Sequence, residues 1–537
     1  MEPAPPTEPR PGSDRRSDRR LTIALWAALA VAVIVRVAFL ADKPFWRDEA
    51  WVALLVADPL RAVSDGRAVP LGFLLMTRLA AALPLASPEV SYRLVPLLCG
   101  VAVVPLLARL ALALGQSRRT AVAAAWLAVG LQPLVYYSRE LKSYDIDLLL
   151  AVLLPLLALR GFQASTSRPA ARWGFLACVV AAPWVSYGGI FPVCAVLAWG
   201  WLAWWRDGSP EVRRAWMRCT VAFVVSFVVV YLVALGPQAN SPRLQAYWHH
   251  SLSSDARYWL PQQFLVACWK FASISATYLF RGLWPAVLLV AAVGACTWPR
   301  PQRGFLLFYY AATASFCAAA AVTDHYLLVN GRHLLCAAPI PLLWAAGGLG
   351  SIGRRLGPRL GGAFVLAIPV VLSLAWSAQA IRLRLGPYHT NASHFFRFDV
   401  LHDADTLIGL AGQHIRNDEP LLVSRKCAYA YQFYNRGRIA DATYCERYCA
   451  NFRSIARKWL DGVRSRAWVM ITDEEKDSFG RFLDEEGFGH RLRASASGMR
   501  LWEIERKGTG RARDTQRTTT PGSESGKRSP PPTTWPE

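Results

Sequence analysis

The stretch that decides the fold is residues 21–55, LTIALWAALAVAVIVRVAFLADKPFWRDEAWVALL. It opens with an apolar run over about 21–41, which is long enough as a helix to cross a bilayer core of about 30 Å. Apolar runs of roughly 18–22 residues recur up to about residue 380 of the 537. The chain after about residue 388 alternates short apolar runs with charge. The sequence therefore predicts an α-helical polytopic membrane protein with a small soluble part at its C-terminal end.

The apolar runs predict eleven membrane spans. They lie at about 21–41, 92–114, 120–137, 145–160, 173–187, 190–205, 217–235, 276–297, 304–322, 334–350 and 361–381. A twelfth apolar stretch, at about 69–86, carries Arg78 near its middle. If this stretch does not cross, nearly all loop arginines share the side of the N-terminus, and the short opposite turns hold only Arg139, Lys142 and Arg332. The positive-inside rule then predicts an interfacial helix at 69–86 and a cytoplasmic N-terminus.

Four parts of the chain follow from this topology. Residues 1–20 are rich in Pro and Arg and are expected to be a disordered cytoplasmic segment, and residues 507–537 a disordered tail. Residues 21–385 form the transmembrane part. Residues 388–506 mix strand-like and helical runs, which predicts a small α/β domain outside the membrane.

The cysteines and the net charge indicate which disulfide, metal site and macromolecular partner can be expected. Cys427 could form a disulfide with Cys445 or Cys449 in an oxidising compartment, whereas a zinc site lacks the usual CxxC spacing. The net charge of +23 does not indicate a nucleic-acid partner, because the arginines lie in short loops and at the termini. The protein is expected in the inner (plasma) membrane.

Residues that could take part in a reaction lie in four segments on the predicted outer side. They are Arg47-Asp48-Glu49, the turn SRELKSYD (residues 138–145), the aromatic loop of about 236–275, and the turn TDHYLLVNGRH (residues 323–333). Cations can neutralise a phosphate, and a carboxylate can take a proton from a hydroxyl. Such a set suits a reaction on a lipid-phosphate substrate at one leaflet.

Each place also has a simpler interpretation. Asp48 and Glu49 could merely favour the start of a helix, and Arg139 and Lys142 could reach lipid headgroups. His249 and His250 are more simply surface polarity than metal ligands. What favours function is that all four places share one side of the membrane.

Five motifs in order resemble the GT-C glycosyltransferases that use polyprenyl-phosphate sugars, such as protein O-mannosyltransferases and lipid A aminoarabinose transferases. An Asp-Glu pair follows the first span, and RAVPLGFLLMTRL (67–79) is similar to the interfacial helix of these enzymes, with their usual double proline reduced to Pro70. SPEVSYRLVPLLCG (87–100) resembles the Glu-x-x-x-Arg-Leu opening of the second span. YYSRELKSYDIDLLLAVLL (136–154) and NGRHLLCAAPIPLLWAAGGL (330–349) resemble two later segments. The closest likeness is to the bacterial family 39-like group.

The resemblance implies an inverting sugar transfer to an acceptor hydroxyl, with Asp48 as general base and Glu49 orienting the acceptor or the base. Arg139, Lys142 and Tyr144 would line the phosphate or sugar site, Arg332 and His333 would hold the lipid phosphate, and Arg78 would border a lipid access groove. It implies neither a catalytic metal nor another cofactor. The expected partners are a polyprenyl-phosphate-linked sugar donor, the lipid bilayer and a hydroxyl acceptor in a glycan, a lipid or a protein.

Two other classes of function remain open from the sequence. A transporter or flippase of lipid-linked sugars would carry charges at mid-membrane depth and often shows inverted repeats, whereas these spans hold few acids and no repeat. A non-catalytic membrane scaffold would bind a partner through the outer domain. The identity of the sugar and of the acceptor does not follow from the residues.

Overall fold

The structure is a computed structural model that describes most of the chain between residues 14 and 507. The described residues are 14–38, 40–41, 44–45, 47–85, 87–163, 168–242, 244–245, 260–279, 284–323, 326, 331–385, 404–416, 418–435, 437–439, 442–444, 452–463, 466–473, 475–496 and 498–507.

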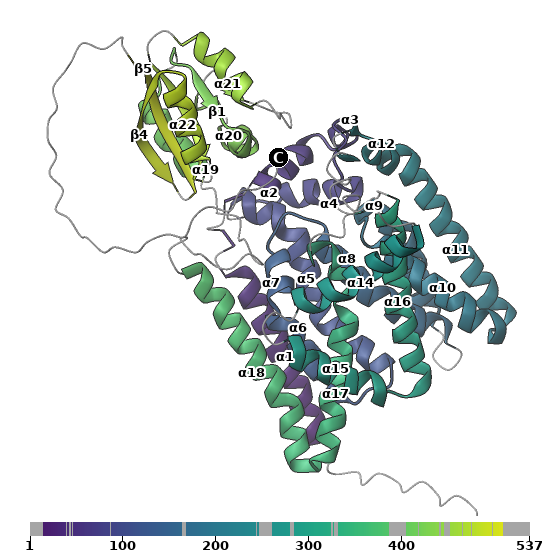
Figure 1. Cartoon of the computed structure of the whole chain (residues 1–537). Coiled ribbons are helices and arrows are strands. Elements are labelled where there is room, and N and C mark those ends of the chain that lie inside the picture. Colours follow the sequence, from purple (N-terminus) through teal and green to yellow (C-terminus); the bar gives the residue numbers. More distant parts are fainter. Residues whose placement is uncertain are drawn as a thin grey trace, which may run out of the picture.

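The first part of the chain is a helical bundle (Figure 1). Its elements are α1 (Asp14–Val37), α2 (Arg47–Ala57), α3 (Arg61–Ser64), α4 (Leu71–Ala81), α5 (Pro88–Ala113), α6 (Arg118–Gly130), α7 (Gln132–Tyr137), α8 (Tyr144–Phe162), α9 (Pro169–Val185), α10 (Ile190–Asp207), α11 (Pro210–Val230), the π-helix η1 (Tyr231–Leu235), α12 (Gly236–Ala239), α14 (Leu260–Leu279), α15 (Trp284–Thr297), α16 (Arg300–Val322), the 3-10 helix η3 (Gly331–Ala337), α17 (Pro339–Arg355) and α18 (Pro358–Leu385).

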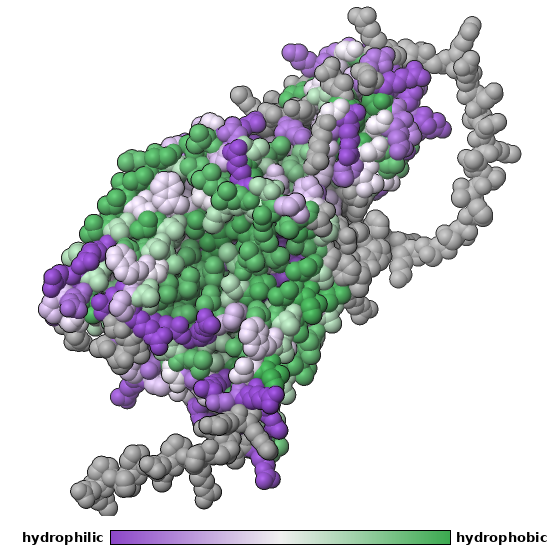
Figure 2. Space-filling model, turned by 180° about the vertical axis from the view of Figure 1, so that it is seen from behind, coloured by the Kyte–Doolittle hydropathy of each residue, from purple (hydrophilic) through white to green (hydrophobic). Residues whose placement is uncertain are grey.

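The bundle is built to sit in a membrane. Among the described residues, five helical stretches are long and apolar enough to cross one: Asp18–Val37, Pro88–Ala113, Pro210–Ala239, Arg300–Val322 and Arg359–Ala378. Large apolar side chains face outward along them, and Figure 2 shows a broad hydrophobic band bordered by hydrophilic residues. A soluble protein would not expose such a band, so the predicted polytopic helical fold is confirmed.

Two expectations need correction. The bounds of the predicted span at 276–297 are wrong, because one helix, α14, ends at Leu279 and another, α15, begins at Trp284. The polar side chains of α14 suggested a loop, yet its Phe271 is buried while Trp269 is 72% exposed, as in a helix with one packed face. The segment expected to be disordered at the N-terminus is already helical from Asp14. The interfacial stretch at 69–86 contains the short helix α4.

A buried arginine stabilises the break between α6 and α7. Arg36 of α1 is fully buried and donates hydrogen bonds to the backbone oxygens of Val129 at 3.0 Å and Ala128 at 3.2 Å. These carbonyls lie in the last turn of α6, where they have no partner within the helix and where the helix dipole favours a cation. Arg36 therefore fixes the end of α6 just before the α7 segment that leads to the 138–143 turn.

The second part is a five-stranded sheet with helices packed on it. Its strands, in the order β2-β1-β3-β5-β4, are β1 (Leu421–Val423), β2 (Ala442–Tyr444), β3 (Arg466–Thr472), β4 (Phe488–Ala496) and β5 (Met499–Arg506). The pairs β1–β2 and β1–β3 are parallel, and β5 pairs antiparallel with β3 and with β4. The helices are α19 (Ala404–His414), α20 (Arg425–Asn435), α21 (Phe452–Asp461) and α22 (Lys476–Glu485). This is the predicted small α/β domain.

The disulfide considered for Cys427 is not borne out. Cys427 is a free, fully buried cysteine in α20, on the side of that helix that packs in the core. Burial raises the pKa of its thiol well above the ordinary value, and the nearby carboxylate of Glu475 adds to this rise. The thiol is therefore a packing group. The two candidate partners, Cys445 and Cys449, lie outside the described residues.

Candidate active site

The acidic pair lies in the first turn of α2. Glu49 is completely buried, whereas Asp48 is half-buried. On a helix, residues three apart are neighbours, so Asp48 shares a face with Trp51. The two carboxylates therefore point in different directions, one into the protein and one toward a partly open surface.

Glu49 is held by a residue of α5. The guanidinium of Arg93 donates to both carboxylate oxygens, from Nε to Oε1 at 2.8 Å and from Nη2 to Oε2 at 2.6 Å, and both side chains are fully buried. The backbone N–H of Leu141 donates to Oε1 at 2.8 Å. This excludes the interpretation of Glu49 as a solvated helix start. Glu49 instead fastens α2 to both α5 and the 138–143 turn.

Arg93 also fixes the segment that leads into α2. Its guanidinium donates to the backbone oxygens of Pro44 at 3.2 Å and Leu40 at 3.4 Å, and its Cζ lies 4.9 Å from the ring centroid of Phe45. One arginine therefore holds both the approach to α2 and the carboxylate next to Asp48. Bidentate guanidinium–carboxylate geometry adds directional specificity to this contact.

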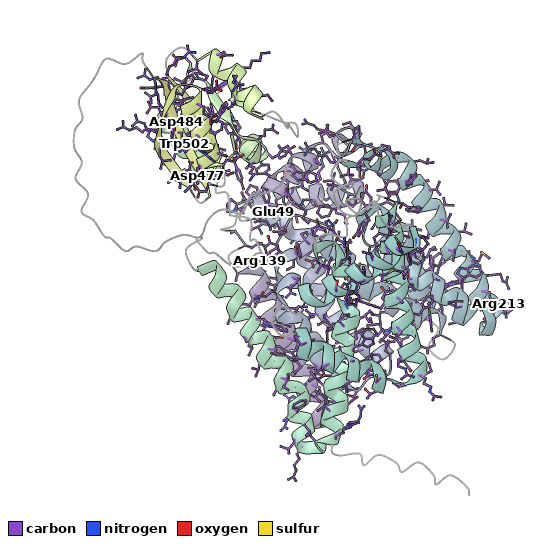
Figure 3. The ribbon with its side chains drawn as sticks, viewed as in Figure 1. Glu49, Arg139, Arg213, Asp477, Asp484 and Trp502 are labelled. Carbon is purple, nitrogen blue, oxygen red and sulfur yellow. The ribbon has the colours of Figure 1, made fainter. Side chains whose placement is uncertain are left out.

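The 138–143 turn brings Lys142 toward the same face of α2. The Nζ atom of Lys142 lies 4.5 Å from the ring centroid of Trp51, a cation–π contact. Arg139 is almost fully buried and donates to the backbone oxygen of Ala38, beyond the end of α1. Glu49 and Arg139 both lie at the end of the bundle that faces the sheet domain (Figure 3).

The rings of Tyr144, at the start of α8, and His333, in η3, are in contact. Their ring centroids are 5.5 Å apart with nearly perpendicular ring planes, and the ring centroid of Tyr137 lies 5.3 Å from that of Tyr144. The ring of Tyr326 lies 5.9 Å from that of His333, and its hydroxyl donates to the backbone oxygen of His333 at 2.6 Å. The last turns of α7, the start of α8 and η3 therefore converge.

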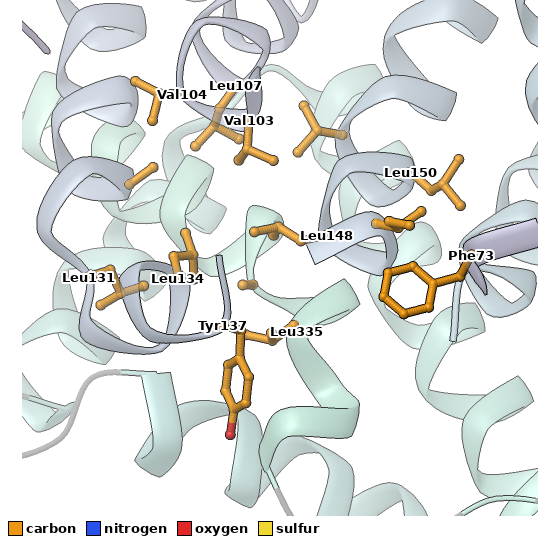
Figure 4. Packing of buried hydrophobic residues seen from close by; sticks show 14 of the residues in the cluster. Phe73, Val103, Val104, Leu107, Leu131, Leu134, Tyr137, Leu148, Leu150 and Leu335 are labelled. Atoms are coloured by element: carbon orange, nitrogen blue, oxygen red, sulfur yellow. The ribbon is translucent and has the colours of Figure 1, made fainter. Parts of the chain in front are cut away.

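A close-packed core supports this convergence, as Figure 4 shows. Its members come from α4, α5, α7, α8, η3 and the junction between α6 and α7, and include Phe73, Val103, Val104, Leu107, Leu131, Leu134, Tyr137, Leu148, Leu150 and Leu335. Side chains on such a core hold fixed positions, as a catalytic site requires.

The likeness to known proteins covers this region. Residues 73–241, from α4 to just past α12, match the model of the dolichyl-phosphate-mannose-protein mannosyltransferase family. The structure is similar to that of ArnT from Cupriavidus metallidurans in the apo state, with a TM-score of 0.56, 12% identity, and coverage of 91% of this chain and 98% of ArnT. Residues 73–241 therefore resemble that mannosyltransferase family, and the chain shares the fold of ArnT.

Two further structures resemble this chain. The same ArnT bound to undecaprenyl phosphate gives a TM-score of 0.51 at 13% identity, with coverage of 91% of this chain and 98% of ArnT. The oligosaccharyltransferase of Archaeoglobus fulgidus in complex with zinc and sulfate gives a TM-score of 0.48 at 14% identity, with coverage of 89% of this chain and 72% of that one. No curated protein matches the sequence.

The fold does not bring every predicted residue to this place. Arg78 is exposed on α4, beside Leu75 and Leu79, which are 53% and 74% exposed. Arg78 therefore lies on a face of α4 that is not packed in the core. Arg332 lies in η3, but its side chain is outside the described part of the chain, as are residues 246–259 with His249 and His250. Within the described ranges, no group of three His, Cys, Asp or Glu could hold a metal ion; that the reaction needs none stays a prediction.

The sequence did not indicate two contacts of this region. Arg93 was visible as part of a motif, but its partner is 44 residues away and no local pattern pairs them. Asp147 accepts a hydrogen bond from the hydroxyl of Ser186, which in turn accepts from the N–H of Gly189 at 2.7 Å. An aspartate in an apolar span was the available signal for this second contact.

Proposed function

We propose that this protein is a membrane glycosyltransferase that moves a sugar from a polyprenyl-phosphate-linked donor to an acceptor hydroxyl at the outer face of the membrane, with inversion at the anomeric carbon. The observation that carries the proposal is the packing of the Asp48 helix against the 138–143 turn through Glu49 and Lys142. The family match over residues 73–241 and the ArnT structure bound to undecaprenyl phosphate support the class of donor.

Asp48 is the proposed general base. Its carboxylate takes the proton of the acceptor hydroxyl while the hydroxyl oxygen bonds to the anomeric carbon. The bond from that carbon to the phosphate oxygen breaks, and its electron pair leaves with the phosphate. Because the leaving group departs as a stable anion, it needs no proton, and a cation beside it suffices.

Lys142 and Tyr144 are the proposed contacts of the donor. Lys142 is half-buried beside Trp51, on the face that Asp48 shares, and can neutralise the phosphate. Tyr144 and His333 present an aromatic surface at the start of α8. Arg139 supports this turn through Ala38, and Arg332 and Arg78 are proposed for the lipid phosphate and the lipid access groove.

The test of the function is a transfer assay in native membranes. Membranes containing the protein are incubated with a panel of radiolabelled polyprenyl-phosphate sugars, and the labelled product is isolated. We expect one donor to label a product, with the anomeric configuration by NMR opposite to that of the donor. A product that retains the configuration would exclude the single displacement. If the chain only moves a lipid-linked sugar across the bilayer, no labelled product forms.

We further propose that the N-terminus is cytoplasmic and the sheet domain outside, in the inner (plasma) membrane. We expect Asp65→Cys in intact cells to react with a membrane-impermeant maleimide, and Ser117→Cys to react only after permeabilisation. Both substitutions are made in a chain without other reactive cysteines. Labelling of both positions from the same side would refute the eleven-span topology.

A further inference from the structure

Helix α20 of the sheet domain lies against the segment that carries Asp48. Figure 1 shows α20 beside α2. The hydroxyl of Tyr434 accepts a hydrogen bond from the backbone N–H of Phe45 at 2.7 Å and donates to Oε1 of Glu89 at 2.9 Å. Phe45 precedes Asp48 by three residues, and Glu89 lies one turn before Arg93 on α5. A single side chain of the outer domain therefore contacts both elements that define the acidic pair.

Burial keeps this phenol in the form that the contacts need. Tyr434 is almost fully buried, and burial raises the pKa of its hydroxyl, with the Glu89 carboxylate raising it further. The hydroxyl therefore stays protonated across the physiological range and can donate to Glu89 while accepting from Phe45.

An aromatic cluster surrounds the contact. The ring of Phe433 lies 5.1 Å from that of Phe45 and 6.0 Å from that of Tyr92, and Phe45 lies 5.7 Å from Tyr92, all edge to face. Phe45 is fully buried. The contact between α20 and the segment before α2 is thus apolar around the two hydrogen bonds of the Tyr434 hydroxyl. These bonds give the contact a defined geometry.

A second tyrosine of α20, Tyr429, is connected to the part of the site that contains Lys142. The hydroxyl of Tyr429 accepts from Nη2 of Arg67 at 2.9 Å, and the Cζ of Arg67 lies 4.8 Å from the Tyr429 ring centroid and 5.3 Å from that of Trp51. Trp51 is also the ring that Lys142 approaches. The chain of contacts runs from α20 through Arg67 and Trp51 to the proposed phosphate ligand.

The loop that carries Arg67 is itself held in place. Gly66 has φ of 60°, and its backbone oxygen accepts from the hydroxyl of Ser241 at 3.1 Å. A Cβ at Gly66 would lie 2.2 Å from the Cβ of Ser241, so only glycine fits there. Arg67 is therefore presented to Tyr429 and Trp51 from a fixed backbone.

We propose that α20 of the sheet domain completes the active site, with Tyr434 and Tyr429 as positioning residues for Asp48 and Lys142. This rests on the proposed function, because it takes Asp48 as the base and Lys142 as a phosphate ligand. The outer domain is then part of the catalytic unit and more than a platform for the acceptor. Neither tyrosine touches the reacting atoms.

The test uses the full-length protein in lipid nanodiscs. For Tyr434→Phe, we expect kcat of transfer to fall about tenfold, as for loss of a hydrogen bond to a charged group, while KM for the donor changes by less than about twofold. Hydrogen exchange of peptides over 44–57 should become faster, while peptides of the sheet domain keep their rates. Glu89→Gln retains an acceptor for the hydroxyl and should keep most of the activity, whereas Glu89→Ala should resemble Tyr434→Phe.

The matched control is Tyr431→Phe in the same helix. The hydroxyl of Tyr431 points to the backbone oxygen of Ile439 within the sheet domain, at 3.5 Å. We expect wild-type transfer and wild-type exchange over 44–57 for this variant. Wild-type kcat for Tyr434→Phe, or an equal loss for Tyr431→Phe, would overturn the positioning role. A wild-type protein that transfers no sugar from any donor would instead refute the proposed function.

Discussion

Asp48→Asn is expected to lower the rate of sugar transfer by about 10³-fold, within the usual range for loss of a general base. Asparagine has nearly the same size and shape, so the first turn of α2 keeps its packing. The change removes only the ability to take a proton from the acceptor hydroxyl. Because the donor site is unchanged, binding of the polyprenyl-phosphate donor should stay within about twofold of wild type. The measurements are initial rates in nanodiscs and equilibrium binding of labelled donor.

The control for this substitution is Asp58→Asn. Asp58 follows the last residue of the same helix and is exposed. The change removes one negative charge at the other end of α2 and leaves the first turn intact. We expect wild-type rates. Transfer by Asp48→Asn at the wild-type rate would contradict the assignment of the base, and loss of donor binding would make Asp48 a donor ligand.

Local patterns were enough to predict most of the membrane part. A run of apolar residues is a one-dimensional signal, and it located α5 and α16 within a few residues. Counting arginines on each side predicted that the stretch containing α4 does not cross. The same method failed at α14, because its polar face hid a helix whose Phe271 packs inside the bundle. Amphipathic segments carry less of this signal than uniformly apolar ones.

The candidate site was predictable only in part. The sequence indicated that Asp48, Lys142 and Tyr144 share one side of the membrane, and motif order indicated a related chemistry. It did not indicate that Glu49 would be buried against Arg93, or that Arg139 would contact Ala38. Such pairs join residues 44 and 101 positions apart, and only the packed bundle determines them. The contact of Tyr434 with Phe45 spans 389 positions and depends on how the sheet domain docks.

Arg93→Met is expected to be among the most destabilising single changes in the bundle. It leaves the fully buried carboxylate of Glu49 without its counter-ion, which typically costs about 3–5 kcal/mol. We expect a clearly lower midpoint of thermal unfolding in detergent, followed by intrinsic tryptophan fluorescence, and loss of transfer. The control is Arg118→Met, which breaks the exposed pair with Asp18 and should cost less than about 1 kcal/mol.

The double variant Glu49→Leu/Arg93→Met separates stability from function. Replacing both members of a buried ion pair with apolar groups is often neutral or stabilising, so the unfolding midpoint should return close to that of wild type. Transfer should stay low, because the N–H of Leu141 has lost the carboxylate that holds the Lys142 turn against α2. A double variant that regains both stability and transfer would show that the pair serves only the fold. A stable but inactive double variant would show that Glu49 joins the base and the phosphate ligand into one site.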